Sequence, residues 1–149
     1  MSPRAVQIAV IGAGDPEPAT VEQARQVGRL LAERGATVVT GGLGGVMSAA
    51  CEGAKAAGGR TLGILPGTDS ATANRFCDVV VPTGFGEARN TLVVRSADAL
   101  IALPGKYGTL SEIAFALVTG KPVVSLGSWE VSTEVSKAAT PEEAVELAL

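Results

Sequence analysis

Short apolar runs rich in β-branched residues alternate with stretches of helical periodicity, and this alternation limits most strongly what the chain can fold into. The runs span residues 6–11, 37–40, 61–65, 79–81, 99–103 and 123–126. Repeated strand–helix–strand units predict an α/β fold, a single Rossmann-like doubly wound parallel sheet with helices on both faces. Aromatic residues make up only 3% of the 149 residues, so the core must consist mainly of aliphatic side chains, which suits a sheet buried on both faces. No linker divides the chain, which predicts one domain over residues 1–149.

Glycines and capping boxes predict where the helices begin and end. Thr20 with Gln23 predicts the start of the first helix, and Thr140 with Glu143 predicts the start of the last. Further helices are predicted over about residues 46–57, 87–96 and 109–119. Each predicted helix therefore separates two of the apolar runs or follows the last one.

Charge and reactive residues exclude several classes of protein. A net charge of −3 without a basic block argues against a nucleic-acid partner. The chain has no histidine, and Cys51 and Cys77 form no CxxC pair, so no metal site is expected and hydrolases that use an imidazole base are excluded. No apolar run reaches membrane-spanning length, so no membrane partner is expected and the protein is predicted to be cytoplasmic.

Three glycine-rich loops follow predicted strands and precede predicted helices. They contain Gly12 and Gly14, then Gly42, Gly44 and Gly45, and finally Gly105 and Gly108. The carboxyl ends of parallel strands form one ligand crevice, where glycines let backbone N–H groups approach an anion at a helix N-terminus. For any single loop a tight turn is an equally good interpretation, but three such loops at one edge favour phosphate binding. None of the loops is a standard dinucleotide or NTPase fingerprint.

These loops belong to a set of motifs that resembles a known superfamily. The motifs are Gly41-Gly42-x-Gly44-Gly45-Val46-Met47, Ala88-Arg89-Asn90 and Pro104-Gly105-x-x-Gly108-Thr109-x-x-Glu112. In this order they resemble the LOG-like superfamily, which includes the LONELY GUY phosphoribohydrolases and the molybdenum-cofactor carrier proteins. The likeness to the carrier branch is greatest, through Gly63-Ile64-Leu65-Pro66-Gly67 and Tyr107-Gly108-Thr109-Leu110-Ser111-Glu112.

The resemblance implies a function and a site. It implies cleavage of the N-glycosidic bond of a nucleoside 5′-monophosphate, with Arg89 and Glu112 as the catalytic residues. It implies that the ligand contacts Gly12, Gly14, Gly42, Gly44, Gly45, Met47, Asn90, Gly105, Lys106, Tyr107, Gly108 and Thr109. The alternative is a non-catalytic carrier of molybdenum cofactor. No cofactor is required on either interpretation; the small phosphorylated partner is an AMP-like nucleotide or molybdopterin, and the resemblance implies a homodimer or homotetramer.

Several residues keep a second interpretation. Thr109 and Glu112 have the spacing of a capping box, and Arg89 has the spacing of a solvated helix arginine. Met47 fits a ligand pocket or a helix core equally well, and Trp129 fits a domain edge or a subunit contact. The polar segment 68–77 is predicted as a loop, either a lid over the ligand or an ordinary surface loop.

Two residues depart from the enzyme pattern. Lys106 replaces the second glycine of the family's PGG loop, where it either adds a cation to the phosphate site or crowds it. Asn90 stands where the enzymes commonly have a lysine. Phosphate binding is compatible with both departures, whereas catalysis depends more closely on them.

Overall fold

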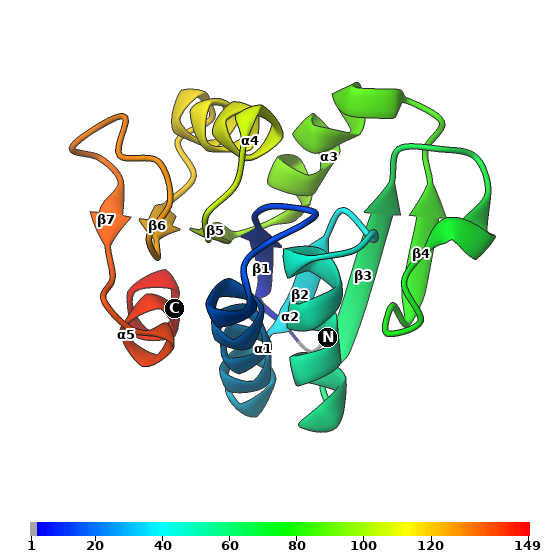
Figure 1. Ribbon diagram of the computed structural model, residues 1–149, viewed down its shortest axis with the longest axis horizontal. Helices are drawn as coiled ribbons and strands as arrows, with labels where there is room; N and C mark the ends of the chain where they lie inside the picture. Colours follow the sequence, from blue (N-terminus) through cyan, green and yellow to red (C-terminus); the bar gives the residue numbers. More distant parts are fainter. Residues whose placement is uncertain (1–2) are drawn as a thin grey trace.

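A computed structural model describes residues 3–149 and contains one seven-stranded parallel sheet covered by helices on both faces (Figure 1). The strands are β1 (Gln7–Ile11), β2 (Thr37–Thr40), β3 (Arg60–Leu65), β4 (Val79–Pro82), β5 (Ala99–Ala102), β6 (Val123–Ser125) and β7 (Ser136–Lys137). The helices are α1 (Pro18–Glu33), α2 (Val46–Ala56), α3 (Arg89–Ser96), α4 (Tyr107–Val118) and α5 (Pro141–Ala148), with the short 3-10 turns η1 (Ser70–Thr72) and η2 (Gly86–Ala88). The predicted α/β fold class is confirmed.

The strand order creates a switch point in the middle of the sheet. The order is β4-β3-β2-β1-β5-β6-β7, and β1 lies between β2 and β5. Ile8 of β1 is in register with Val38 on one side and with Ala99 on the other. The chain winds outward from β1 in one direction as far as β4 and then in the other direction from β5. The loops after β1 and β5 therefore diverge, which opens a crevice at the carboxyl edge.

Two apolar layers bury the two faces of the sheet. Helices α1, α2 and α5 cover one face, and α3 and α4 cover the other (Figure 1). Side chains alternate along β1, so that Ile8 and Val10 pack toward α1 and α2 whereas Ala9 and Ile11 pack toward α3 and α4. Gly28 lets α1 and α2 approach closely, because a Cβ there would lie 1.9 Å from the carbonyl oxygen of Ala50.

Some local predictions hold and others are wrong. Thr140 caps α5 by accepting a hydrogen bond from the Glu143 N–H, so the predicted start of this helix is confirmed, while Glu143 Oε1 accepts from the Ala139 N–H one residue before the cap. Thr20 does not cap α1, because the helix begins at Pro18 and Thr20 is buried within its first turn. Proline sets its own backbone angle and needs no N–H partner, so a helix can start there without a side-chain cap.

The segments without a regular sequence pattern contain short elements. Segment 68–77 includes the turn η1, and the region between β6 and α5 contributes the two-residue strand β7 at the sheet edge. Helix α3 begins at Arg89 because the turn η2 occupies the two residues before Arg89 that the sequence assigned to the helix. Within residues 3–149, no helix has the length and apolar character needed to cross a membrane.

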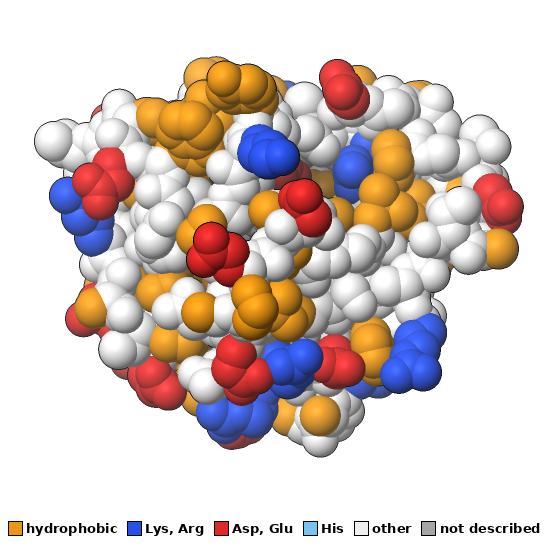
Figure 2. Space-filling view, in the orientation of Figure 1, with side chains coloured by type: hydrophobic (Ala, Val, Ile, Leu, Met, Phe, Trp, Pro, Cys, Tyr) orange, Lys and Arg blue, Asp and Glu red, His pale blue; other side chains and the backbone are white. Residues whose placement is uncertain are grey.

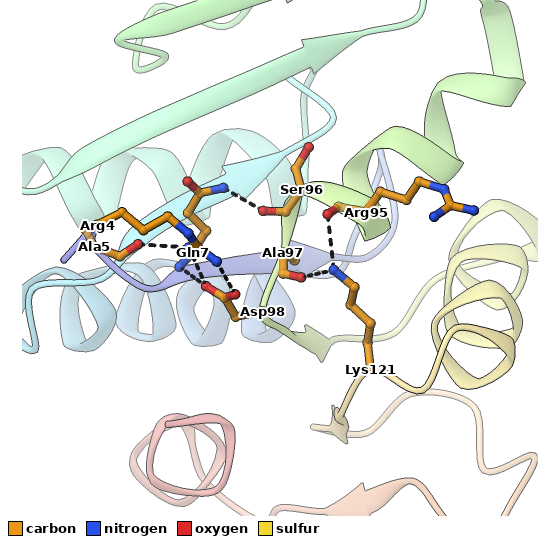
Figure 3. Close-up of polar contacts among 8 residues, drawn as sticks. All are labelled: Arg4, Ala5, Gln7, Arg95, Ser96, Ala97, Asp98 and Lys121. Atoms are coloured by element: carbon orange, nitrogen blue, oxygen red, sulfur yellow. Dashed lines mark hydrogen bonds and ion pairs between the residues drawn. The ribbon is translucent and has the colours of Figure 1, made fainter.

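A polar network closes the amino edge of the sheet (Figure 3). The Asp98 carboxylate accepts hydrogen bonds from both terminal nitrogens of Arg4, at 2.9 and 2.7 Å, and from the Gln7 N–H at 2.9 Å. These hydrogen bonds lower the pKa of Asp98 to about 2. Lys121 donates from Nζ to the carbonyl oxygens of Arg95 and Ala97, at the end of α3. Arg4, Asp98 and Lys121 are thus each paired or hydrogen-bonded.

Candidate functional site

A cavity of about 190 Å³ opens at the carboxyl edge of the sheet, at the switch point between β1 and β5. It is lined by Val10, Ile11, Gly12, Ala13, Gly14, Asp15, Gly41, Met47, Arg89, Asn90, Lys106, Gly108, Thr109 and Glu112. The lining therefore comes from the end of β1, from the loops after β1, β2 and β5, from the first turns of α2 and α3, and from the first two turns of α4. Basic and acidic side chains lie close together near the middle of the face seen in Figure 2.

Backbone hydrogen bonds join the three glycine-rich loops into one frame. The Ala13 N–H donates to the Pro104 carbonyl at 2.9 Å, and the Val46 N–H donates to the Ala13 carbonyl at 3.0 Å. Gly45 has a φ of +68°, and a Cβ there would lie 2.4 Å from the Ala13 carbonyl oxygen. Only glycine fits this position, because both the backbone angle and the close approach exclude a side chain. The loop that carries Gly12 and Gly14 is thus held between the other two.

Arg89 is the first residue of α3, and its side chain lines the cavity. Its Nη1 donates to the carbonyl oxygens of Gly41 at 2.7 Å and of Ile64 at 3.2 Å, which fixes the guanidinium at the ends of β2 and β3. Its Nε is buried and has no hydrogen-bond partner among residues 3–149. Burial lowers the pKa of Arg89, and the nearby Glu112 opposes that shift. A buried N–H donor without a partner is what an incoming acceptor would satisfy.

Glu112 lies in α4 and is only 9% exposed. Burial raises the pKa of Glu112 to about 8, and the charge of Arg89 opposes this shift without cancelling it. Among residues 3–149, no hydrogen-bond donor stabilises the ionised form of the Glu112 carboxyl group. The side chain is therefore mostly protonated at neutral pH, and a buried carboxylic acid can donate a proton or a hydrogen bond.

The start of α4 supplies backbone donors to the same cavity. Tyr107, Gly108 and Thr109 form the first turn, so their N–H groups have no carbonyl partner one turn earlier in the helix. Gly105 precedes them, and a Cβ there would lie 2.1 Å from Thr109 Oγ1 and 3.1 Å from the Ala13 N atom. The helix N-terminus and the Lys106 ammonium group together favour an anion at this end of the cavity.

The structure brings most of the predicted site residues to the cavity wall. Those on the wall are Gly12, Gly14, Met47, Arg89, Asn90, Lys106, Gly108, Thr109 and Glu112. Gly42, Gly44, Gly45, Gly105 and Tyr107 do not line it. Gly42 and Gly45 shape the second loop through positive φ angles, and Tyr107 is 79% exposed with its ring stacked on Trp129.

Two of the second interpretations do not fit the geometry. Thr109 is not a helix cap, because α4 begins at Tyr107 and Lys106 occupies the cap position. Arg89 is not a solvated helix arginine, because it is half-buried and bonded to two strand-end carbonyls. Segment 68–77 bonds to the second glycine loop through the Asn74 N–H and the Gly42 carbonyl at 2.8 Å, and it lines no part of the cavity.

Five further residues lie on the wall that the motifs do not predict, and Asp15 is the one among them with an ionisable side chain. Asp15 directly follows Gly14, so its place beside the two glycines of the first loop is the sequence feature that could have assigned it to the site. The others are Val10, Ile11, Ala13 and Gly41, which line the cavity with small or apolar groups. Asp15 places a carboxylate at the rim, close to a cavity that otherwise favours an anion.

Nearly the whole chain matches a known protein family. The family model described as the SLOG cluster4 family matches residues 5–148. The chain belongs to this family. The predicted resemblance to the LOG-like superfamily, near its molybdenum-cofactor branch, is confirmed.

Relatives of this SLOG cluster4 chain include proteins with named activities. A protein of Archaeoglobus fulgidus is 48% identical over 94% of the chain and 92% of its own length. A cytokinin riboside 5′-monophosphate phosphoribohydrolase of Mycobacterium tuberculosis is 35% identical over 82% of the chain and 71% of its own length. The molybdenum cofactor binding protein of Rippkaea orientalis has a similar structure, with a TM-score of 0.93, 38% identity and coverage of 98% of this chain and 96% of that one.

Proposed function

We propose that this SLOG cluster4 protein binds a phosphate-bearing, nucleotide-like ligand and hydrolyses the N-glycosidic bond of a nucleoside 5′-monophosphate. The observation that carries the proposal is Glu112, a buried carboxyl group with a pKa of about 8 that lies near Arg89 in the cavity. A perturbed acid beside a fixed cation in a cleft is typical of a reaction centre rather than of a surface ion pair. The phosphoribohydrolase of M. tuberculosis supports the same class of reaction.

The anion-binding end of the cavity receives the phosphate. Lys106 and the backbone N–H groups that begin α4 are the donors there, and Asn90 lies on the same wall. The cavity of about 190 Å³ is smaller than the roughly 300–1,000 Å³ of a typical ligand pocket. It therefore encloses part of a nucleotide-sized ligand, and the remainder extends beyond the rim.

Glu112 then acts as the general acid. Its proton passes to the departing base as the glycosidic bond breaks, water adds to the anomeric carbon of the sugar, and the proton that this water releases restores the acid form of Glu112. The products are the free base and ribose 5-phosphate. The unpartnered Nε–H of Arg89 hydrogen-bonds an oxygen or nitrogen acceptor of the bound ligand. Ionisation of Glu112 above its pKa removes the proton, so turnover falls as pH rises through about 8.

The test is incubation of the purified protein with AMP and related monophosphates, with free base measured by chromatography. We expect Glu112→Ala to lower turnover by about 10²–10⁴-fold, which is the range of general acid–base catalysis. Binding of AMP by calorimetry is measured in parallel. Wild type that releases base no faster than Glu112→Ala, at background rate, overturns the hydrolase proposal.

The second candidate is a non-catalytic carrier of molybdenum cofactor. It is favoured by Lys106 at the cavity wall and by the likeness to the molybdenum cofactor binding protein of R. orientalis. Under this proposal the phosphate of a pterin occupies the anion-binding end, and the protein needs no further cofactor. Saturable pterin binding without release of base from any monophosphate supports the carrier. Absence of pterin binding, with AMP turnover present, rejects it.

We also propose a homodimer or homotetramer in the cytoplasm, with a small molecule rather than nucleic acid as the ligand. Large apolar side chains are exposed at Phe85, Tyr107 and Val118, with 63%, 79% and 82% of their surface accessible. Figure 2 shows apolar atoms gathered over α4, where an interface between copies would bury them. Light scattering of the eluting protein at micromolar concentration tests the assembly, and a monomer there contradicts it.

A further inference from the structure

Trp129, the one tryptophan in the sequence, contacts residues 105–107, the binding loop at the anion-binding end of the cavity. Its indole Nε1–H donates to the carbonyl oxygens of Gly105 at 3.1 Å and of Lys106 at 3.2 Å. Its ring stacks on the ring of Tyr107, with centroids 6.3 Å apart and planes inclined by 26°. One side chain from the loop after β6 thus contacts three consecutive residues, the last two of the loop after β5 and the first of α4.

Peptide geometry connects these contacts to the cavity. In a trans peptide unit the C=O and the following N–H point in opposite directions, and the described chain has no cis peptide bond. The Gly105 carbonyl shares its peptide unit with the Lys106 N–H, and the Lys106 carbonyl shares its unit with the Tyr107 N–H. Trp129 holds the Gly105 carbonyl, and it shares the Lys106 carbonyl with the Leu110 N–H of α4, which donates to it at 3.1 Å. Both N–H groups are therefore turned away from the indole. Trp129 itself lines a separate hollow behind the loop, with Gly105 and Gly127.

The sheet holds Trp129 in place. Strand β6 continues beside β5 through a hydrogen bond from the Leu126 N–H to the Ala102 carbonyl at 2.8 Å. Gly127 then adopts a φ of +77°, and a Cβ there would lie 3.6 Å from Cγ of Pro104. The Ser128 N–H donates to Ser125 Oγ at 2.9 Å. The residues before Trp129 are therefore tied to the carboxyl ends of β5 and β6, which positions the indole independently of the loop that it contacts.

We infer that Trp129 is a positioning residue, which presets the backbone N–H groups of residues 106 and 107 for the phosphate of the ligand. The inference rests on the proposed function, since it concerns the same anion-binding end. Donors that are already aligned lose less conformational freedom on binding than a mobile loop does. Loss of the two indole hydrogen bonds is expected to weaken ligand binding about tenfold.

The test compares wild type with Trp129→Phe, which keeps an aromatic ring against Tyr107 but removes the N–H donor. Val131→Ala is the matched control, because Val131 lies two residues further along the same loop and is 48% exposed. We expect Trp129→Phe to raise the Kd for AMP, or the KM where turnover occurs, about tenfold, with kcat changed much less. Val131→Ala should leave these constants at their wild-type values.

Hydrogen exchange of the ligand-free proteins measures the loop directly. Trp129→Phe should speed amide exchange in residues 105–109 and leave β1 and α1 unchanged, whereas a general loss of stability would speed exchange in all of them. Unchanged loop exchange together with a wild-type Kd overturns the inference while ligand binding stands. Absence of AMP and pterin binding by wild type overturns the proposed function instead, and with it the ligand role of Trp129.

Wild type offers a measurement that needs no substitution. Because Trp129 is the one tryptophan, its fluorescence reports on the loop alone. We expect AMP or pterin binding detected by calorimetry to shift or quench this emission with the same Kd. Saturable binding that leaves the emission unchanged counts against contact between Trp129 and the binding loop, even if Trp129→Phe fails to fold.

Discussion

The Asp98 carboxylate at the amino edge of the sheet accepts three hydrogen bonds. Glu112 at the carboxyl edge is buried, and among residues 3–149 no hydrogen-bond donor stabilises its ionised form. The outcomes are opposite: the pKa of Asp98 is lowered to about 2, and the pKa of Glu112 is raised to about 8. Asp98 is the more exposed of the two, so the contrast comes from partners as well as from burial.

The basic residues at the two edges differ in the same way. Lys121 donates to the carbonyl oxygens of Arg95 and Ala97 and thereby satisfies the end of α3. Arg89 also bonds two carbonyls, but its Nε is buried without a partner among residues 3–149. Unsatisfied polar groups cost stability, and proteins retain them mainly where function requires them. The amino edge therefore stabilises the fold, and the carboxyl edge leaves groups available for a ligand.

The largest expected effect of this contrast is the pH dependence of stability caused by Glu112. An unfolded glutamate loses its proton near 4.5, but folded Glu112 keeps it up to about 8. Between these values the folded state binds more protons, so the free energy of unfolding falls as pH rises. We expect Glu112→Gln to remove this slope and to be more stable than wild type by a few kcal/mol at pH 8. Urea unfolding at pH 5, 6.5 and 8 measures the difference.

The matched control is Glu134→Gln, an exposed glutamate outside the cavity. This variant should keep the wild-type slope over the same pH range. A Glu112→Gln curve parallel to that of wild type would show that Glu112 is ionised in the folded protein. The contrast between the two edges would then fail, and the general-acid role with it.

Arg89 gives the next largest effect, on ligand binding. Arg89→Met keeps much of the side-chain stem and removes the guanidinium, together with its bonds to Gly41 and Ile64. We expect the Kd for AMP to rise about 10–100-fold, the range for loss of a charge-assisted hydrogen bond. Arg95→Met is the control on the same helix, because Arg95 is exposed and lies over the Phe115 ring. Equal loss of affinity in both variants would contradict a specific role for Arg89.

Local sequence patterns predict much of this fold because strands and helices depend on near neighbours. The β-branched runs locate the ends of β1 to β6 to within one residue, and Thr140 with Glu143 locates the start of α5. The two exposed residues of β7 carry no apolar pattern, since they pair only at the sheet edge. The start of α1 was missed because Thr20 has the sequence of a cap, whereas Pro18 already fixes a helical angle.

The site is less predictable, because its members meet only through the strand order. Glycine loops and the family motifs point to Arg89, Glu112 and the start of α4, which the structure places on one cavity. No local pattern links Trp129 to Gly105, which lies 24 residues earlier, because their contact depends on β6 pairing beside β5. The raised pKa of Glu112 likewise results from tertiary burial and has no signal in sequence spacing.

At the amino edge, Asp98→Asn is expected to cost about 1 kcal/mol of unfolding free energy at pH 7. The figure is modest because the Asp98 side chain is 37% exposed, and solvent screens its pairing with Arg4. The lowered pKa stabilises the fold above about pH 4, and this contribution is lost as pH falls toward 2. The gap between wild type and variant, measured by urea unfolding, should therefore close in acid. Weaker AMP binding by Asp98→Asn would contradict the assignment of stability to the amino edge and of ligand binding to the carboxyl edge.

Lys121→Met should have the smallest effect, about 0.5 kcal/mol. It removes the ammonium group that satisfies the carbonyls of Arg95 and Ala97, where a cation also complements the helix dipole. Lys121 is in addition one of the charges that lower the pKa of Asp98, so the two substitutions are coupled. In an Asp98→Asn background the cost of Lys121→Met should be smaller than in wild type, because that attraction is already gone. Fully additive unfolding free energies would mean that Lys121 acts only on the end of α3, and that the amino edge is two independent contacts instead of one network.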